Sequence, residues 1–556
     1  MKELVVRLFK SPVLAAEIFI ATLFITLLTL AMPLYVIQIL NRYVTYGFHG
    51  TLITLTTGML MAVFLQLTFR ILRTKMATVV NQAPNDRLSL EVLGIISRAK
   101  AEPLDQFSKP RIQETLNHVQ TVQKTYDAQT LNTLVDAPFS LLLIAVIYLL
   151  SPLLAGLALT GIAIGLFTGW VSTKKSQQGA EQLMAENAGH RAMAYSAVNA
   201  LETVRAFGAA GFLQNLWQDQ VAKISRWQKK ITVSKEISQT LTLSGSSLTS
   251  VFLYAVGATL VVRGELTVGA LIGANILASR AYQNTTRLVP AGYMLGRAKK
   301  ALQDIAQMKR LPMEPDSGSA LRAYKGRVEF QDVGFAYPGM AHPVFESVSF
   351  HVSPGTAMAV VGLNGTGKTT LAKLLIGLLE PRRGSILADD VNLQQLAWPW
   401  WRRQIIYMPQ EPAFINGTIR ENILFLHPDL DEALLNHILR VSDLKPFLDK
   451  APNGLDTVLT DNGKNLPPGI RRRLSLVRGL VTNGHLVVLD EPTDAMDETG
   501  AMAVYKLMNE LMKAGKTIIV FSNDPKILKG VSTVLNLNIK PTPEMIKTPV
   551  PGIKGE

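Results

Sequence analysis

The feature that most limits the possible folds is a set of long apolar stretches in the first half of the chain. Each is long enough to cross the ~30 Å hydrocarbon core of a bilayer as a helix, where helices and closed barrels alone satisfy their backbone polar groups. They run over 18–40, 51–69, 131–150, 152–173 and 240–262. A weaker sixth stretch, 266–290, is interrupted by Arg280 and Arg287. The sequence therefore predicts a helical membrane domain of six spans.

The composition agrees with a membrane domain and narrows the classes of partner. The chain has 556 residues, a mean hydropathy of +0.21 and a net charge of +14. The basic residues are scattered, without a basic stripe interleaved with aromatic residues, so the charge does not indicate a nucleic-acid partner. There is no cysteine, which excludes disulfides, thiolate metal sites and cysteine nucleophiles.

Basic residues predict the orientation of the spans. Arg70, Arg73 and Lys75 follow the second span, and positive charge favours the cytoplasmic side. The long polar segments 72–130 and 172–239 then face the cytoplasm. Their apolar residues recur with helical spacing, so we expect the helices to continue out of the membrane.

Three charged residues lie in or next to the predicted spans. Arg280 and Arg287 are seven residues apart, two helical turns, and therefore share a face. They form either a basic wall of a transport pathway or side chains that reach back to the interface. Asp136 lies at a membrane boundary, and the same two interpretations stay open for it.

A glycine-rich loop stands in the second half of the chain, between an apolar run at 358–361 and a helical pattern at 371–375. It fits the phosphate-binding pattern G-x-x-x-x-G-K-[ST], in which backbone N–H groups wrap a polyphosphate, the lysine reaches the outer phosphates and the hydroxyl ligates magnesium. Its residues are Gly362, Leu363, Asn364, Gly365, Thr366, Gly367, Lys368, Thr369 and Thr370.

A second nucleotide signal is the apolar run 486–489, which ends in Asp490 and Glu491. Asp490 is placed to hold the magnesium shell, and Glu491 to polarise the water that attacks a phosphoanhydride. The two signals reinforce each other, because both strands must end at one crevice of an open sheet.

Composition also predicts the domain boundaries. The membrane domain takes 1–310, and a linker rich in proline, glycine and serine takes 311–325. A mixed α/β domain around a mainly parallel sheet follows over 326–540. The tail, 541–556, combines prolines with lysines and is expected to be disordered.

At this point the chain resembles an ATP-binding cassette (ABC) exporter half-transporter, with six spans followed by a nucleotide-binding domain. The resemblance implies ATP and Mg²⁺ as cofactors. Tyr337 resembles the aromatic residue that stacks on adenine, and Gln410 the glutamine near magnesium. Segment 417–423 is similar to one typical of exporters, and Asp497 resembles the D-loop aspartate.

Segments 134–139 and 201–209 are similar to those of type I secretion transporters. That resemblance implies a bacterial inner membrane with the nucleotide-binding domain in the cytoplasm. It also implies export of a protein substrate with a periplasmic adaptor and an outer-membrane tunnel protein.

Two departures from the family stand out. The signature, whose serine and N–H groups grip the ATP of the opposite subunit, is degenerate here and reads Leu466, Pro467, Pro468, Gly469 and Ile470. The prolines remove two N–H donors, and each lost charge-directed hydrogen bond costs roughly 1.5–3 kcal/mol. Where the family's switch histidine is expected the chain has Ser522, which cannot carry positive charge.

Because Glu491 is kept, we expect an ATP hydrolase coupled to transport, with low activity as a homodimer. As half of a heterodimer, the chain would offer its phosphate-binding loop to the partner's signature. Two alternatives stay open: a lipid or multidrug exporter, and a subunit that binds ATP to hold a complex together without hydrolysing it.

Overall fold

The computed structural model describes residues 2–315, 317–320 and 323–547. They divide into two units. The helical unit comprises Met1–Arg98 and Gln106–Leu311, and the sheet unit comprises Ala99–Asp105 and Pro312–Glu556. The main part of the second unit thus begins at Pro312, inside the predicted linker 311–325. The unit also includes seven residues from the first half of the chain, Ala99–Asp105.

Among the residues that the structure describes, five helical segments are long and apolar enough to span a membrane: Pro12–Tyr46, His49–Arg98, Ala128–Leu150, Pro152–Asn199 and Ala210–Val262. They coincide with the first five predicted spans. The sixth stretch is divided between two helices, α12 (Val268–Thr286) and α13 (Leu288–Met308), neither of which is among these five segments. Even so, α12 packs against α3, α8, α9 and α11 inside the bundle.

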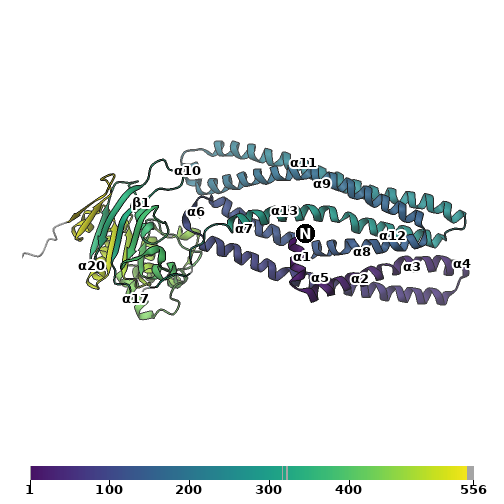
Figure 1. The fold of residues 1–556 in the computed structure, drawn as a ribbon, viewed down its shortest axis with the longest axis horizontal. Coiled ribbons are helices and arrows are strands. Elements are labelled where there is room, and N and C mark those ends of the chain that lie inside the picture. Colours follow the sequence, from purple (N-terminus) through teal and green to yellow (C-terminus); the bar gives the residue numbers. More distant parts are fainter. Residues whose placement is uncertain (1, 316, 321–322, 548–556) are drawn as a thin grey trace, which may run out of the picture. The chain divides into compact units, whose positions relative to one another are not determined.

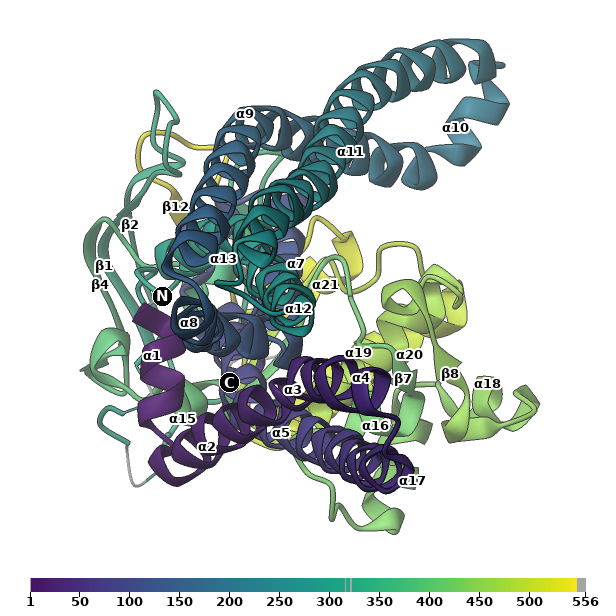
Figure 2. The same cartoon turned by 90° about the vertical axis from the view of Figure 1, so that its right-hand side faces the viewer.

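The helices of this unit range from one or two turns to about fifty residues, and the longest are α5, α9 and α11 (Figure 1). Their bounds are α1 Lys2–Phe9, α2 Pro12–Thr29, α3 Ala31–Gln38, η1 Ile39–Tyr43, α4 Val44–Tyr46, α5 His49–Arg98, α7 Lys109–Thr125, α8 Ala128–Leu150, α9 Pro152–Asn199, α10 Leu201–Ala206 and α11 Ala210–Val262. Helix α5 has 50 residues and so measures about 75 Å, more than twice the hydrocarbon core. Helices α9 and α11 run side by side, with α10 at their end (Figures 1 and 2). The long polar segments are therefore largely continuations of spanning helices, as predicted.

Small residues let the helices of the bundle approach closely. The buried ring of Tyr282 on α12 lies against Gly165 of α9 and Gly245 of α11. A Cβ at either glycine would come within 2.5 Å of the Tyr282 hydroxyl. Because lipid tails give no hydrophobic drive between helices, this close packing holds such a bundle together.

The sheet unit is built on a six-stranded sheet in the order β12-β11-β3-β10-β9-β6. A separate antiparallel sheet has the order β2-β1-β4-β5, and β7 pairs with β8. The strands are β1 Val328–Phe335, β2 Phe345–Val352, β3 Ala357–Val361, β4 Arg383–Ala388, β5 Val391–Asn392, β6 Ile405–Met408, β7 Gly417–Thr418, β8 Val458–Leu459, β9 Leu486–Asp490, β10 Thr517–Phe521, β11 Thr533–Asn536 and β12 Glu544–Lys547.

The helices of the sheet unit are α6 Ala101–Asp105, α14 Lys368–Leu375, α15 Trp398–Arg403, α16 Ile419–Leu424, α17 Glu432–Val441, α18 Lys445–Lys450, α19 Pro468–Leu480, α20 Glu498–Lys513 and α21 Pro525–Lys529, with short turns η2 Leu393–Gln395, η3 Gly454–Asp456 and η4 Asp461–Gly463. The prediction of a mixed α/β domain around a mainly parallel sheet is confirmed.

The first residues of the predicted disordered tail are ordered. Strand β12 (Glu544–Lys547) pairs antiparallel with β11, and Leu535 faces Met545 across the pair. The prediction of disorder from 541 is therefore wrong for this strand, because β11 leaves an open edge whose backbone groups favour one more strand. Residues 548–556 lie outside the described part of the chain.

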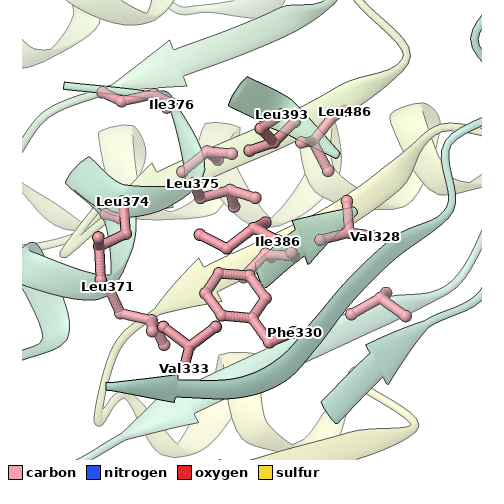
Figure 3. Packing of buried hydrophobic residues seen from close by; sticks show 14 of the residues in the cluster. Val328, Phe330, Val333, Leu371, Leu374, Leu375, Ile376, Ile386, Leu393 and Leu486 are labelled. Carbon is pink, nitrogen blue, oxygen red and sulfur yellow. The ribbon is translucent and has the colours of Figure 1, made fainter. Parts of the chain in front are cut away.

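Helix α14, which follows the glycine-rich loop, is fixed by the largest core cluster of the unit (Figure 3). Its Leu371 and Leu374 face Phe330 and Val333 of β1 and Ile386 of β4. All five are at most 2 % exposed, and each such side chain contributes roughly 1.5–3 kcal/mol of transfer free energy. The beginning of α14 is thereby held at a fixed place relative to the strands.

Candidate functional site

Four parallel strands bring the predicted site residues together at one edge of the six-stranded sheet. Strand β10 pairs in parallel with both β3 and β9, so Phe521 is in register with Val360 and with Asp490. Strand β6 pairs in parallel with β9, with Met408 opposite Leu489. Since the carboxyl ends of parallel strands meet at the same edge, the loops after these strands share one crevice.

The phosphate-binding loop has a backbone that requires glycine at two positions. Gly367 caps α14 with φ +102°, and a Cβ there would lie 2.5 Å from the ring of Phe345. A Cβ at Gly362 would lie 2.4 Å from the Thr366 hydroxyl. The loop therefore closes tightly onto the start of α14, which is the shape that cradles a phosphate chain with N–H groups.

Lys368 is nearly buried at the first position of α14, with 8 % exposure. Its Nζ donates a hydrogen bond of 2.6 Å to the carbonyl oxygen of Gly362 and lies 3.3 Å from Oε1 of Glu491. The ammonium group thus joins the loop to the predicted catalytic carboxylate, and it stands where the outer phosphates of a nucleotide would be held.

Oxygen atoms suited to magnesium gather beside the lysine. Thr369 donates a hydrogen bond of 3.2 Å from Oγ1 to Oε1 of Gln410. Asp490 is fully buried, and neither of its carboxylate oxygens has a hydrogen-bond partner among the described residues. Burial raises the pKa of this carboxyl above its ordinary value. Two buried oxygens without donors fit a cation, and hydroxyl, amide and carboxylate oxygens are the ligands that Mg²⁺ prefers.

Glu491 is held in an unusual backbone conformation, with φ +49°. Its N–H donates to the carbonyl oxygen of Phe521 at 2.8 Å, and its own carbonyl accepts from Nη1 of Arg472 at 2.5 Å. Nη2 of the same arginine donates to Asp494 at 2.9 Å. Non-glycine residues in such conformations cluster at active sites. Sequence reasoning did not find Arg472, because only the fold brings it to Glu491.

Asn523, one residue after the predicted switch position, contacts the phosphate-binding loop. Its Oδ1 accepts from the N–H of Gly362 at 3.1 Å, and its Nδ2 donates to the carbonyl of Gly362 at 2.9 Å. Ser522 is 1 % exposed, and its hydroxyl accepts from the N–H of Asp524 instead. The expectation that Ser522 stands beside the loop is therefore wrong, and Asn523 is the residue of the two that contacts it.

Two other predicted residues lie in the same unit with defined contacts. The Tyr337 hydroxyl is 3.2 Å from Oγ1 of Thr370, and its ring stands edge-on to Phe335. Asp497 caps α20 by accepting from the N–H of Gly500 at 3.0 Å, which is the main reason why its pKa is lowered. It also forms an ion pair with Arg473 of α19.

The degenerate signature forms the start of α19. Pro467 is the N-cap and Pro468 the first helical residue, both exposed, and the cap provides no side-chain hydrogen bond. Proline is well tolerated at a helix start, so the helix forms normally. The exposed N–H donors expected of an intact signature at these two positions are nevertheless missing.

Comparisons with known proteins agree with this geometry. The family model for the ABC transporter transmembrane region matches residues 15–284, and the ABC transporter model matches residues 345–494. A solved structure of a bacterial Atm1-family ABC exporter with ATP bound superimposes with a TM-score of 0.83 at 21 % identity, and the match covers 96 % of this chain and 95 % of the other.

Among curated proteins, the chain is similar to the toxin RTX-I translocation ATP-binding protein of Actinobacillus pleuropneumoniae, with 24 % identity over 526 residues. It is equally similar, at 24 % over 525 residues, to the alpha-hemolysin translocation ATP-binding protein of Proteus vulgaris. In both cases the match covers 93 % of this chain and 73 % of the relative.

Proposed function

Since the chain belongs to the ABC transporter family, we propose that it is the ATP-binding and permease subunit of a type I protein secretion exporter in a bacterial inner membrane. The family couples ATP hydrolysis to transport. The names of the similar toxin and hemolysin translocation proteins support a polypeptide substrate. As parts of the same proposal, the exporter works with a periplasmic adaptor and an outer-membrane tunnel protein, and the sheet unit lies in the cytoplasm.

The observation that carries the proposal is the set of contacts around Lys368. The ammonium group touches the first glycine of the phosphate-binding loop and the carboxylate of Glu491. Thr369, Gln410 and Asp490 supply oxygens beside it that would hold Mg²⁺, which would bridge and neutralise the phosphates of ATP. Glu491 would orient the attacking water and accept its proton.

The start of α19 favours a heterodimer over a homodimer. Two cassettes of this family pair head to tail, so the signature of each completes the site of the other. Pro467 and Pro468 offer a partner's ATP no N–H donors. A partner with an intact signature would instead complete the site built on Lys368 and Glu491, and that site would be the one that hydrolyses ATP.

A subunit that binds ATP to hold a complex together without hydrolysing it is the second candidate. The prolines of α19 and the uncharged Asn523 favour it, whereas the complete phosphate-binding loop and Glu491 oppose it.

The test is to purify the complex through a tag on this chain and to determine its subunits by native mass spectrometry. We expect one copy of this chain with a second exporter subunit and a copurifying adaptor. Two copies of this chain without an adaptor would contradict both the heterodimer and the secretion assignment. In cells, deletion of this chain should abolish appearance of the exported polypeptide in the medium, and Glu491→Gln should do the same. Normal export by Glu491→Gln would favour the non-hydrolysing candidate.

A further inference from the structure

A buried ion pair joins two spanning helices of the helical unit. Arg73 of α5, 7 % exposed, donates through both terminal nitrogens to the carboxylate of Asp136 on α8, with Nη2 at 3.4 Å from Oδ2. Nη1 of Arg73 also lies 3.2 Å from the hydroxyl oxygen of Thr22 on α2. Asp136 is thus a structural partner of Arg73, and its charge is already matched.

Three further arginines lie near this pair. Arg70 precedes Arg73 by about one turn of α5, and Arg280 and the C-cap Arg287 lie before and after Thr285 on α12. Arg70 also interacts electrostatically with these three arginines and with Asp136. The hydroxyls of Ser140 and Thr285, 3.0 Å apart, bring α8 and α12 together beside them. Within the described chain, Arg70, Arg280 and Arg287 have no ion pair. Four cations therefore share one carboxylate, an arrangement whose self-repulsion favours an additional anion.

The open face of α12 is apolar in its first half, where Ile272 and Ile276 are partly exposed, and polar in its second half, where Arg280 and the C-cap Arg287 lie. Its buried residues follow one side of the helix, whereas Ser279, Arg280, Gln283 and Asn284 follow the other and remain at least partly exposed. Among the described residues of α12, Val268 at its first position is the one large exposed hydrophobic residue. Helix α5, by contrast, exposes many, including Leu60, Phe64 and Leu67.

A helix face turned toward lipid tails would be apolar, as that of α5 is. The polar second half of this face suits the wall of a water-filled path, which is where charged residues inside membrane domains are found. Arg280 lies twelve residues after Val268, about 18 Å along the helix, so it is well within a ~30 Å hydrocarbon core. Lipid headgroups lie at the surface of that core, whereas the carboxylates of a polypeptide passing through a path can reach this depth.

We propose that Arg70, Arg280 and Arg287 form an anion-binding site on the wall of the translocation path, and that the site takes carboxylate side chains of an acidic segment of the exported polypeptide. The inference rests on the proposed export function for the identity of the ligand. Arg287 and Arg70 lie toward one end of the spans, and Arg280 lies two turns deeper, so the site offers successive positions to a moving chain. Arg73 is a positioning residue, since Asp136 already holds its guanidinium.

The test measures binding of two labelled peptides to the full-length complex by fluorescence anisotropy, in nanodiscs of neutral phosphatidylcholine. One peptide alternates Glu and Ser, and the other replaces each Glu by Gln. We expect the Glu peptide to bind at least ~tenfold more tightly. The pair Arg280→Gln with Arg287→Gln should remove this preference, whereas Arg280→Lys with Arg287→Lys should keep most of it. Arg263→Gln, in the exposed turn after α11, is the matched control and should change nothing.

Equal binding of the two peptides, or a preference that survives the glutamine variants, would overturn the proposal. Equal binding combined with one further result would assign the arginines to a lipid headgroup instead. That result is a wild-type complex that retains phosphatidylglycerol through purification and glutamine variants that lose it. Export is measured separately. If the wild-type complex prefers the Glu peptide but exports no polypeptide, the secretion assignment fails and the anion site stands. If export is normal but the complex shows no preference for the Glu peptide, the anion site fails and the secretion assignment stands.

Discussion

Asn523 holds the backbone of Gly362 by two hydrogen bonds. Its Oδ1 accepts from the N–H of Gly362, and its Nδ2 donates to the carbonyl oxygen of Gly362. The first glycine of the phosphate-binding loop is therefore anchored by the strand end of β10. The carbonyl of Gly362 also accepts from Lys368, so one peptide group connects Asn523, the loop and, through the lysine, Glu491.

Asn523→Ala should weaken ATP binding because the loop loses this anchor. Two hydrogen bonds at about 0.5–1.5 kcal/mol each correspond to a Kd that is about five- to 150-fold higher. Titration with a fluorescent ATP analogue measures it. Ser522→Ala is the matched control and should leave the Kd within about twofold, since Ser522 faces Asp524. A larger effect from Ser522 than from Asn523 would restore the expectation that Ser522 stands beside the loop.

Asp490→Asn should stabilise the nucleotide-free chain by about 1–3 kcal/mol at neutral pH, because it removes a buried charge without hydrogen-bond donors. Burial raises the pKa of Asp490 in the folded state, so the folded state holds this proton more tightly than the unfolded state does. Stability should therefore fall as the pH rises from the ordinary aspartate pKa through the raised one.

Thermal unfolding in detergent as a function of pH measures both effects. The Asn variant should melt a few degrees higher, show a flatter pH profile and gain little from Mg²⁺ with ATP. Glu510→Gln, on the exposed face of α20, is the control. A melting temperature for Asp490→Asn below that of the wild type would count against a cation site at these oxygens.

Asp136→Asn should destabilise the helical unit by about 3–5 kcal/mol, because it leaves the buried guanidinium of Arg73 without its carboxylate. Adding Arg73→Gln should recover part of the loss, since no charge then remains buried. The measurement is the fraction of protein that still elutes as folded on size-exclusion chromatography after heating to a series of temperatures. Lys75→Gln, on the same helix, is the control. No difference between the single and double variants would mean that the two residues are not coupled.

Restoring the signature should raise activity. Pro467→Ser with Pro468→Gly returns two N–H donors and a hydroxyl at the start of α19. ATP hydrolysis by preparations of this chain alone should increase at least ~tenfold, because each charge-directed hydrogen bond contributes about 1.5–3 kcal/mol. The same pair combined with Glu491→Gln should show no increase. An unchanged rate in the restored variant would mean that the prolines do not limit hydrolysis.

Short sequence patterns correctly predicted those parts of the fold that are determined by residues close together in the sequence. The glycine-rich loop, the apolar strand before Asp490 and the first five spans each carry their signal within a short window, and the structure contains all of them. The sixth span is less apolar because Ser279, Arg280 and Gln283 follow the partly exposed side of α12 in its second half. Helix α12 is recognised as part of the bundle by its packing against neighbouring helices and not by its hydropathy.

The sequence-based predictions failed or were incomplete where a contact depends on the three-dimensional position of a residue. The side chains of Ser522 and Asn523 leave the end of β10 in different directions, so an offset of one residue exchanges a buried hydroxyl for the contact with the loop. Arg73 and Asp136 are 63 residues apart, and Arg472 of α19 reaches Glu491 in the loop after β9. No sequence window contains either pair. Strand β12 depends on the free edge of β11, which the fold alone creates.

The most direct test of the central claim is the ATPase rate of the complex purified through a tag on this chain, compared between the wild type and Glu491→Gln. If this chain supplies the hydrolytic site, the substitution should reduce the rate by at least ~hundredfold while ATP still binds, because the group that activates water is lost and the phosphate-binding loop is intact. A rate equal to that of the wild type would contradict the account, since ATP would then be hydrolysed elsewhere in the complex.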